Sequence, residues 1–457
     1  MKDDIPNSPE ARDAHNLMHP YTNARKLQSD GPLVIESGEG IYVTDIHGNR
    51  YIEAMSGLWS AGLGFSEKRL VAAATKQLEV LPFYHVFSQR SHGPAIDLAE
   101  KLVNLAPVPM SKAFFTNSGS EANDTAVKML WYRAHAMGTP EKKKIISRLR
   151  GYHGVTVAAA SMTGLPYNHM SFGLPLPGFL HTGSPHYWRD AEPDESEADF
   201  VARRARELEE LILAEGPETI AAFIGEPVLG GGGVVVPPKG YWQAIQAVLD
   251  KYDILLIADE VICGFGRTGN MFGTETFGMK PDMMTLSKQI TSSYQPFSAL
   301  LVNDRVFEPI ADESNRIGTF GHGYTGGGHP VGAAVALETL RIIEEDNLLD
   351  HVRRVGAHMQ AGLAELADHP LVGEHRGVGL IAALELVTDK ATKAPHGKPG
   401  ALGGIASARM QAHGVISRNM TDALAFCPPM IVTEAEVDEI LARTKLALDE
   451  TAEEIGA

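Results

Sequence analysis

The chain of 457 residues has little positive charge and little cysteine, and each of these limits the partners or the cellular compartment that we expect. Forty lysines and arginines stand against 57 aspartates and glutamates, which gives a net charge of −17. Nucleic acids and anionic membranes bind basic surfaces, so we expect neither as a partner. The two cysteines, Cys263 and Cys427, lie in apolar stretches, which is typical of a reducing compartment.

Long hydrophobic runs and metal-binding patterns are also missing. No stretch approaches the ~18 consecutive apolar residues that a membrane-spanning helix needs. The first residues, MKDDIPNSPEARDAHN, are polar and lack the apolar core of a signal peptide. We therefore expect a cytoplasmic protein. Histidine, cysteine and carboxylate residues show no metal-ligand spacing, so the sequence predicts no metal site.

Apolar runs that end in a charged residue are the most informative feature that is present. Asp259, Glu226 and Lys288 each follow directly after such a run. The runs predict strands buried on both faces, and their alternation with helical patterns predicts a doubly wound, mostly parallel α/β sheet. Ligands of such sheets collect outside the carboxyl ends of the strands, so we expect the three residues to share one site.

The pair of Lys288 and Asp259 points to one cofactor. A lysine at the end of a buried strand is costly unless its charge is removed, and a Schiff base removes it. The cofactor that takes a lysine in this way is pyridoxal phosphate, which also needs an acid against its ring nitrogen. Taken singly, a surface lysine and a salt-bridged aspartate are the simpler interpretation; the motif around them reverses it.

A turn before a helix predicts an anion site. Ser118 begins the helix after a strand pattern, and Glu121 stands three residues later, as in a capping box. The turn exposes N–H groups at the positive end of the helix dipole. An ordinary capped helix explains the segment equally well; beside the charged strand ends, it predicts a phosphate cradle at Gly119 and Ser120.

Two glycine patterns do not predict a dinucleotide site. Segments that begin at Gly264 and Gly321 both match G-x-G-x-x-G. A dinucleotide fingerprint needs these glycines to open a helix directly after a strand, and neither segment does so. We therefore expect no nicotinamide or flavin cofactor.

The stretch IADEVICGFGRTG, followed by SKQ, resembles the class III aminotransferases, which are fold-type I pyridoxal-phosphate enzymes. Within them the sequence is similar to the pyruvate-dependent amine (omega) transaminases, with matches from Tyr42 to Pro429. The resemblance implies a large domain with a mostly parallel doubly wound sheet and a smaller α+β domain formed from the N- and C-terminal segments. We place the N-terminal segment, which also covers the active site, at residues 1–65, the large domain at 66–330 and the C-terminal small domain at 331–457.

The resemblance also implies roles for single residues. Lys288 would hold the cofactor and transfer protons, and Asp259 would keep the ring nitrogen protonated. The implied cofactor-binding residues are Gly119, Ser120, Tyr152, His153, Glu226, Asp259, Val261, Lys288 and Thr325. The implied substrate residues are Trp59, Tyr84, Phe87, Tyr152 and Arg418. From the residues alone, Trp59, Tyr84 and Phe87 are better explained as packing anchors and Arg418 as an exposed residue, whereas His153 is equally well explained as a buried histidine.

The glycine-rich segment GHGYTGGGHP implies a shared site. In the family this segment contributes a threonine, here Thr325, to the phosphate of the other subunit's cofactor, which implies a homodimer or a tetramer. The family more often has a bulkier residue and a serine or alanine where this chain has Gly326 and Gly327. The rigidity of the loop and its substrate contacts are therefore open at this point.

The sequence thus predicts an aminotransferase that moves an amino group from a primary amine or ω-amino acid to pyruvate by a ping-pong mechanism. Three alternatives remain. The first is another class III reaction, such as that of a lyase, decarboxylase or aminomutase. The second is a transaminase for 4-aminobutyrate or ornithine that uses 2-oxoglutarate. The third is a non-catalytic binding protein on the same fold, against which the presence of Asp259 and Lys288 argues.

Overall fold

A seven-stranded sheet forms the centre of the chain in the computed structural model, which describes residues 7–456. The strand order is β4-β10-β9-β8-β7-β5-β6. Strands β5 to β9 are parallel to their neighbours in this order, whereas β10 is antiparallel to both β9 and β4. In chain order the strands are β4 (Lys112–Thr116), β5 (Lys144–Arg148), β6 (Phe179–Thr182), β7 (Ile220–Gly225), β8 (Leu255–Asp259), β9 (Met283–Leu286) and β10 (Ser298–Val302). The predicted α/β fold with a mostly parallel sheet is confirmed.

The sheet is covered by helices on both faces, which explains its apolar strands. Leu255 and Ile257 of β8 belong to the core on the side of helix α6 (Gly119–Ala136). Leu256, which points to the opposite face, belongs to the core on the side of α10 (Tyr241–Lys251). A strand with two buried faces needs apolar residues at consecutive positions, and these are the runs seen in the sequence.

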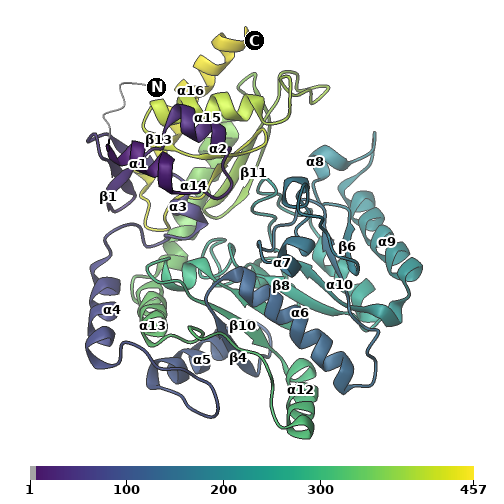
Figure 1. The fold of residues 1–457 in the computed structure, drawn as a ribbon. Helices are drawn as coiled ribbons and strands as arrows, with labels where there is room; N and C mark the ends of the chain where they lie inside the picture. Colours follow the sequence, from purple (N-terminus) through teal and green to yellow (C-terminus); the bar gives the residue numbers. More distant parts are fainter. Residues whose placement is uncertain (1–6, 457) are drawn as a thin grey trace.

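The N- and C-terminal segments lie together at one end of the molecule (Figure 1). Strands β1 (Ile35–Glu39), β2 (Tyr42–Asp45) and β3 (Arg50–Glu53) form an antiparallel meander, which includes the predicted hairpin. Strand β13 (Val415–Ile416) adds to it in parallel beside β3. The small domain is therefore built from both ends of the chain; the boundaries near residues 65 and 330 stay predictions.

A second small sheet carries Arg418. Its order is β11 (Val372–Val378), β12 (Ile381–Leu386), β15 (Ala423–Phe426) and β14 (Arg418–Met420). A hairpin turn separates β11 from β12, because Gly379 takes a φ of 57°. Arg418 is the first residue of β14.

The remaining helices lie between the strands and towards both ends of the chain. Residues 7–30 contain two short helices. In the C-terminal segment a helix begins at Ala401. No helix among residues 7–456 is long and apolar enough to cross a membrane. The helices not yet given are α1 (Pro9–Asn16), α2 (Ala24–Asp30), α3 (Ser56–Trp59), α4 (Lys68–Val80), α5 (Gly93–Leu105), α7 (Val157–Met162), α8 (Tyr187–Asp190), α9 (Glu197–Glu215), α11 (Gly273–Phe277), α12 (Asp304–Ile317), α13 (Pro330–Glu345), α14 (Leu348–Leu366), α15 (Ala401–Ala412) and α16 (Glu434–Ile455).

Capping differs between the two helices for which a capping box was expected. Thr433 and Glu436 form a complete box at the start of α16. At α6 the box is half formed. The Ser118 hydroxyl accepts from the Glu121 N–H (3.2 Å), but the Glu121 carboxylate accepts from the N–H of Asn117 (2.7 Å) instead of Ser118.

Candidate active site

The carboxyl ends of five strands gather the predicted residues at one edge of the large sheet. Gly119 follows β4, Tyr152 follows β5, Glu226 follows β7, Asp259 ends β8 and Lys288 follows β9. These strands all run in the same direction, because β10, which separates β4 from β9, is antiparallel to both. The topology therefore brings residues up to 170 positions apart in the chain to one edge, as expected for a ligand site.

Lys288 is half-buried on a strained turn. It begins the 3₁₀ helix η3 (Lys288–Thr291) with a φ of 51°. Left-handed backbone is uncommon for residues other than glycine and concentrates at functional sites. Burial lowers the pKa of its amine to about 8, while the charges of Asp259 and Glu226 act in the opposite direction. A large share of the amine is therefore neutral, and thus nucleophilic, near physiological pH.

Asp259 is a buried carboxylate held from several elements. Its Oδ2 accepts hydrogen bonds from Asn123 Nδ2 (2.9 Å) and His153 Nδ1 (2.8 Å). Its Oδ1 accepts only from the N–H of Val261 (3.2 Å) and can accept a further donor. Asn123 is itself fixed by the Thr285 hydroxyl, which donates to its Oδ1 (2.8 Å). Sequence reasoning missed Asn123, because it stands between Ala122 and Asp124 at a helix position with no special pattern.

His153 supports Asp259 from behind. Because a carboxylate only accepts, Nδ1 of His153 carries a hydrogen and donates this hydrogen bond to Asp259. Nε2 is buried and has no hydrogen-bond partner among the described residues. Direct contact between His153 and a cofactor stays a prediction.

Glu226 fixes the loop that carries Tyr152. Its carboxylate accepts from the N–H groups of Tyr152 (2.9 Å) and Gly230 (2.9 Å). Burial raises its pKa, although His153 opposes this. Behind it, buried Arg148 donates to the Glu226 carbonyl (2.6 Å). Glu226 therefore joins the loops after β5 and β7 into one rigid wall.

Tyr152 lies beneath an aromatic residue from the N-terminal segment. Its ring lies 6.5 Å from that of Tyr21, edge to face, and Tyr21 in turn lies 6.2 Å from Tyr167. Burial and a hydrogen bond with Tyr21 raise the pKa of the Tyr152 phenol, whereas Arg418 lowers it. Tyr21 was not identified from the sequence, because one aromatic residue in a polar segment carries no pattern.

The start of α6 forms a cradle that a side chain would fill. A Cβ on Gly119 would lie 3.0 Å from Val261 Cγ2, and a Cβ on Gly154 would lie 2.4 Å from Ser120 Oγ. The first N–H groups of a helix have no partner within the helix. Gly119 and Ser120 therefore present amides at the positive end of an 18-residue helix, beside Val261.

Trp59 and Arg418 lie on neighbouring parts of the small domain. Trp59 is 3% exposed and packs in a cluster with Ile262, Cys427 and Ala425. Arg418 is half-buried and pairs with Ala425 across β14 and β15. Its side chain forms none of the hydrogen bonds and ion pairs found among residues 7–456, so it is free to change its direction.

Tyr84, Phe87 and Thr325 form a different group within the chain. The ring of Phe87 covers Gly323, since a Cβ there would lie 2.7 Å from Phe87 Cζ. Tyr84 and Phe87 are 38% and 41% exposed. The segment that carries Tyr84 and Phe87 therefore shares one surface with the glycine-rich loop. The contacts found for Phe87 lie on this surface, and Phe87 is not part of the Trp59 cluster. Phe87 also lines a hollow of about 930 Å³ with His322.

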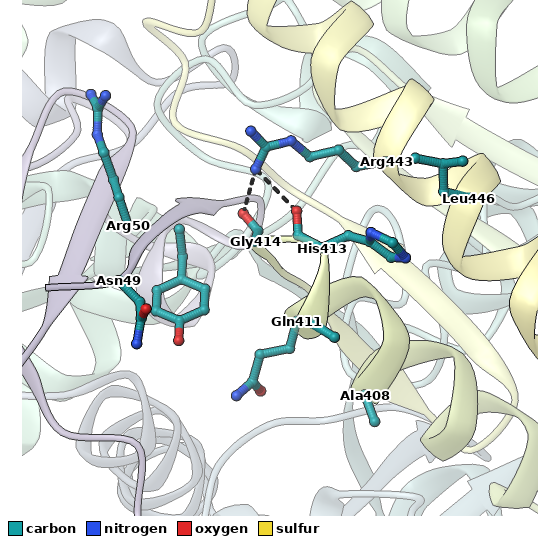
Figure 2. Close-up of a pocket in the computed structure, with 10 residues that line it drawn as sticks. Asn49, Arg50, Ala408, Gln411, His413, Gly414, Arg443 and Leu446 are labelled. Carbon is teal, nitrogen blue, oxygen red and sulfur yellow. Dashed lines mark hydrogen bonds between the residues drawn. The ribbon is translucent and has the colours of Figure 1, made fainter. Parts of the chain in front are cut away.

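Another depression, of about 870 Å³, lies on the small domain (Figure 2). Arg443 donates to the carbonyls of His413 and Gly414, both at 3.1 Å. Arg50 lies 3.7 Å from the ring centre of Tyr42. This depression lies at the end of α15, and none of the predicted site residues lines it.

The edge residues fit pyridoxal phosphate. They supply an amine of lowered pKa in Lys288, spare acceptor capacity in Asp259 Oδ1, and helix amides above a cradle in which a Cβ at Gly119 would crowd Val261. The fold and these groups define a fold-type I pyridoxal-phosphate enzyme.

The family follows from comparison with known proteins. The model of the family "Aminotransferase class-III" matches residues 24–448, and the chain belongs to this family. The omega transaminase of Pseudomonas jessenii, solved in complex with PMP, is 62% identical with a TM-score of 0.98, over 98% of this chain and 99% of that one. A thermostable omega transaminase in which a tryptophan, a phenylalanine and an arginine are replaced, described as engineered for synthesis of bulky amines, is 60% identical with a TM-score of 0.97 and the same coverage. The chloroplastic gamma aminobutyrate transaminase 3 of Solanum lycopersicum is 49% identical over 96% of this chain and 84% of its own length.

Proposed function

We propose that the protein is an omega transaminase that transfers an amino group from a primary amine or ω-amino acid to pyruvate. The observation that carries the proposal is the pairing of a buried Trp59 turn with a half-buried, unpaired Arg418 beside the Lys288 edge. An amine donor without a carboxylate and a keto acid with one must use the same pocket in turn. A fixed buried arginine would be left unpaired by the amine, at a cost of several kcal/mol. An arginine that can turn away avoids this cost.

The chain's own groups account for the acid–base steps. Lys288, with its lowered pKa, would take a proton from the carbon of the bound amine and pass it to the cofactor, and would reverse this transfer with the keto acid; such acid–base catalysis contributes roughly 10²–10⁴-fold. Asp259 would keep a proton on the ring nitrogen, and Asn123 and His153 hold Asp259 in place. Tyr152 and Val261 would line the two faces of the ring. When bound, pyridoxal phosphate supplies the electron sink for the carbanion.

The engineered relative supports the substrate residues. The tryptophan, phenylalanine and arginine that are replaced in it have residue numbers one lower than those of Trp59, Phe87 and Arg418 in this chain. Replacement of these residues is described there as serving bulky amines, which is consistent with a pocket whose size they set.

A second candidate is a 4-aminobutyrate transaminase that uses 2-oxoglutarate. The observation in its favour is the 49% identity to a gamma aminobutyrate transaminase. A longer dicarboxylic acceptor needs space that the buried Trp59 occupies, so the pocket favours pyruvate.

The proposal includes a homodimer in which each subunit completes its partner's site. The α4–α5 segment exposes a group of large apolar residues: Val71, Leu78, Val80, Phe83, Val86 and Ile96. Exposed apolar surface of this extent is typical of an interface. Phe87 and Thr325 lie on the same surface, so an isologous contact there would present both to the partner's Lys288 edge. A tetramer and the expected cytoplasmic location stay predictions.

One comparison of rates tests the proposal. We expect pyruvate to accept amino groups from 1-phenylethylamine with a larger kcat/KM than 2-oxoglutarate does. Arg418→Ala is expected to weaken pyruvate use more than use of the uncharged amine. Trp59→Leu is expected to admit 2-oxobutyrate, because one methylene in a pocket is worth ~1–3 kcal/mol. A preference for 2-oxoglutarate with 4-aminobutyrate as donor would instead establish the second candidate.

A further inference from the structure

Trp59 is held on a turn that an unsupported chain would avoid. Ser56, Gly57 and Trp59 have φ values of 48°, 66° and 63°, all in the left-handed region. L-residues other than glycine enter this region at a cost, because Cβ approaches the following carbonyl oxygen. Two of these three residues carry a Cβ, so contacts outside the turn must hold it.

Glu53 supplies one of these contacts. It ends β3 directly before the turn and is 4% exposed. Its carboxylate Oε2 accepts a short hydrogen bond from the N–H of Gly57, at the centre of the turn. A charge-assisted bond of this kind is roughly twice as strong as one between neutral groups. The carboxylate therefore fastens the turn to the small-domain sheet.

Ser56 supplies the other contact, which carries no titratable group of its own. Its hydroxyl donates to the Cys427 carbonyl (2.6 Å) and accepts from Arg267 Nη2 (3.3 Å). Arg267 also donates to the carbonyls of Leu380 (3.2 Å) and Pro428 (2.5 Å). Protonation of Glu53 therefore weakens one of two supports of the turn and leaves the other intact.

Opposing effects act on the pKa of the Glu53 carboxyl. Burial raises its pKa to about 7, while the N–H groups of Gly57 and Met55 lower it. The ionisable groups near it are the Cys427 thiol, whose pKa Glu53, Arg267 and Lys288 all shift, and Arg267, which donates to Leu380, Pro428 and Ser56. Among residues 7–456 no ion pair offsets the buried charge of Glu53.

We propose that Glu53 is a positioning residue for Trp59: its ionised carboxylate holds the turn that places the indole, and its protonated form lets the turn relax and the acceptor pocket widen. The proposal rests on the function proposed above, because it takes Trp59 as the wall of the keto-acid pocket. Above neutral pH the pocket is narrow and selects pyruvate. Below it, longer keto acids enter more readily.

A competition between two keto acids measures this effect. Pyruvate and 2-oxobutyrate at equal concentration compete for the same aminated holoenzyme, and the ratio of 2-aminobutyrate to alanine gives the ratio of their kcat/KM values. Ionisation of Lys288 cancels in this ratio, because both acids meet the same enzyme form. We expect the ratio to rise about 10-fold as the pH falls from about 9 to about 5, since one methylene in a pocket changes selectivity by about 10–200-fold.

The variant Glu53→Gln separates charge from shape. The amide keeps an acceptor for the Gly57 N–H but does not titrate, so its product ratio is expected to stay constant over the same pH range. The matched control is Asp45→Asn, on neighbouring strand β2. Asp45 is also buried, and it also accepts hydrogen bonds from backbone N–H groups, those of His47 and Asn49. Neither of these groups belongs to the turn that holds Trp59. The control should keep the wild-type pH response.

Tryptophan emission gives a second reading that does not depend on substrate. The chain has four tryptophans, and the difference between the wild-type holoenzyme and Trp59→Phe isolates Trp59. We expect this difference to titrate with a midpoint near 7 and to be constant in Glu53→Gln. If pyruvate is not the acceptor, the emission still titrates and only the proposed function fails. If pyruvate is the acceptor but neither the ratio nor the emission responds to Glu53→Gln, the role of Glu53 is wrong.

Discussion

At the scale of single residues, Lys288 combines burial with a strained backbone, and both favour its use as a covalent anchor. With its pKa lowered to about 8, the amine of the cofactor-free enzyme becomes neutral as the pH rises through that value. We expect capture of pyridoxal phosphate to quicken with pH and to level off above about pH 8. Lys288→Ala is expected to lose turnover and the visible absorbance of the bound cofactor. Lys280→Ala, at an exposed position, serves as the control and should leave both unchanged.

Asp259 differs from other buried aspartates in having spare acceptor capacity where the ring nitrogen is expected. Asp259→Asn cannot hold a proton on that nitrogen, so we expect a loss of kcat of at least about 10²-fold with cofactor still bound. Asp282→Asn is the matched control. Asp282 is also buried, but its oxygens accept from Leu256 N (3.1 Å) and Asn303 Nδ2 (2.9 Å), away from the site. Equal losses in the two variants would mean that Asp259 acts only through stability.

Lys288 and Asp259 could be identified from the sequence because charged residues are unusual at the ends of buried apolar strands. Asn123 and Tyr21 could not. Asn123 occupies a helix position of no special pattern, and its importance comes from the side chains that β8 and β9 bring to it. Tyr21 matters only because the N-terminal segment folds back across the sheet edge.

At the scale of elements, the loop after Gly323 lies tightly against the end of β4. A Cβ on Gly327 would lie 2.6 Å from the backbone oxygen of Phe115, whereas a Cβ on Gly326 would meet the movable side-chain oxygen of Asn117 at 2.7 Å. Here the two glycines permit a close approach that the bulkier residues common in the family would alter. The sequence showed the departure but not its reason, because Phe115 is distant in the chain.

Substitution at these two glycines tests the contact. Gly327→Ala is expected to destabilise the protein by ~1–3 kcal/mol, because backbone must move to accept the methyl group. Gly326→Ala should cost less, since the amide of Asn117 can rotate away. Thermal unfolding compares the two, and cofactor release measured on the same samples reports on the loop. Equal stability of both variants would show that the loop yields freely.

The small-domain hairpin shows how far pattern alone extends at this scale. The run at 378–386, which is apolar except for Glu385, is equally typical of one long strand or of a strand entered through a turn. The left-handed backbone at Gly379 decides between them, and it is fixed by close packing on Arg267 and Thr268, to whose backbone a Cβ at Gly379 would come within 2.6–2.9 Å. Both of those residues belong to the large domain, so local sequence could not reveal the turn.

At the scale of the whole molecule, a buried ion network joins the small domain to the loops around the site. Arg376 of β11 pairs with Glu374 (2.6 Å) and Glu385 (2.7 Å) and donates to the Gly233 carbonyl (2.9 Å). His186, Glu374 and Glu385 bring ligand atoms within 4.8 Å of one another, a spacing that a metal ion could use. Arg376 already neutralises both carboxylates there, so the cluster is explained as an ion network. Sequence spacing could not reveal it, because His186 lies far from β11.

Loss of Arg376 should be costly in a way that depends on pH. Burial opposes ionisation of Glu385, but Arg376 and Arg189 outweigh it and lower its pKa to about 2. Relative to an unfolded value of about 4.3, Glu385 stabilises the fold above pH ~4 and loses this effect as the pH falls towards 2. Arg376→Met removes the cation shared by Glu374 and Glu385 and leaves them with Arg189 and His186 as partners, so we expect a loss of up to ~3–5 kcal/mol at pH 7 that shrinks below pH ~4.

An exposed ion pair provides the control for this measurement. Arg409 pairs with Glu454 at 2.7 Å, but both side chains are 43% exposed. Arg409→Met should therefore change the free energy of unfolding by only ~0–1 kcal/mol. Denaturant unfolding of both variants at pH 7 and at about pH 3 gives the comparison, and a pH-independent loss in Arg376→Met would contradict the role of the charges.

The association of two chains can be tested by mixing inactive variants. Lys288→Ala removes the amine, and Thr325→Asp places a carboxylate where a phosphate contact is expected. If Thr325 serves the partner's site, a mixed dimer has one site with both native residues and one with neither. If it serves its own site, each site of the mixed dimer lacks one of the two. Random exchange of equal amounts yields half mixed dimers, so the first arrangement predicts recovery of about a quarter of the wild-type rate. The second predicts none, because no site is complete.

Phe87→Ala paired with Lys288→Ala extends the test to the aromatic residue that covers Gly323. Since Phe87 and Thr325 share one surface, both pairs should recover activity together, and recovery with only one of them would separate the two residues between the sites.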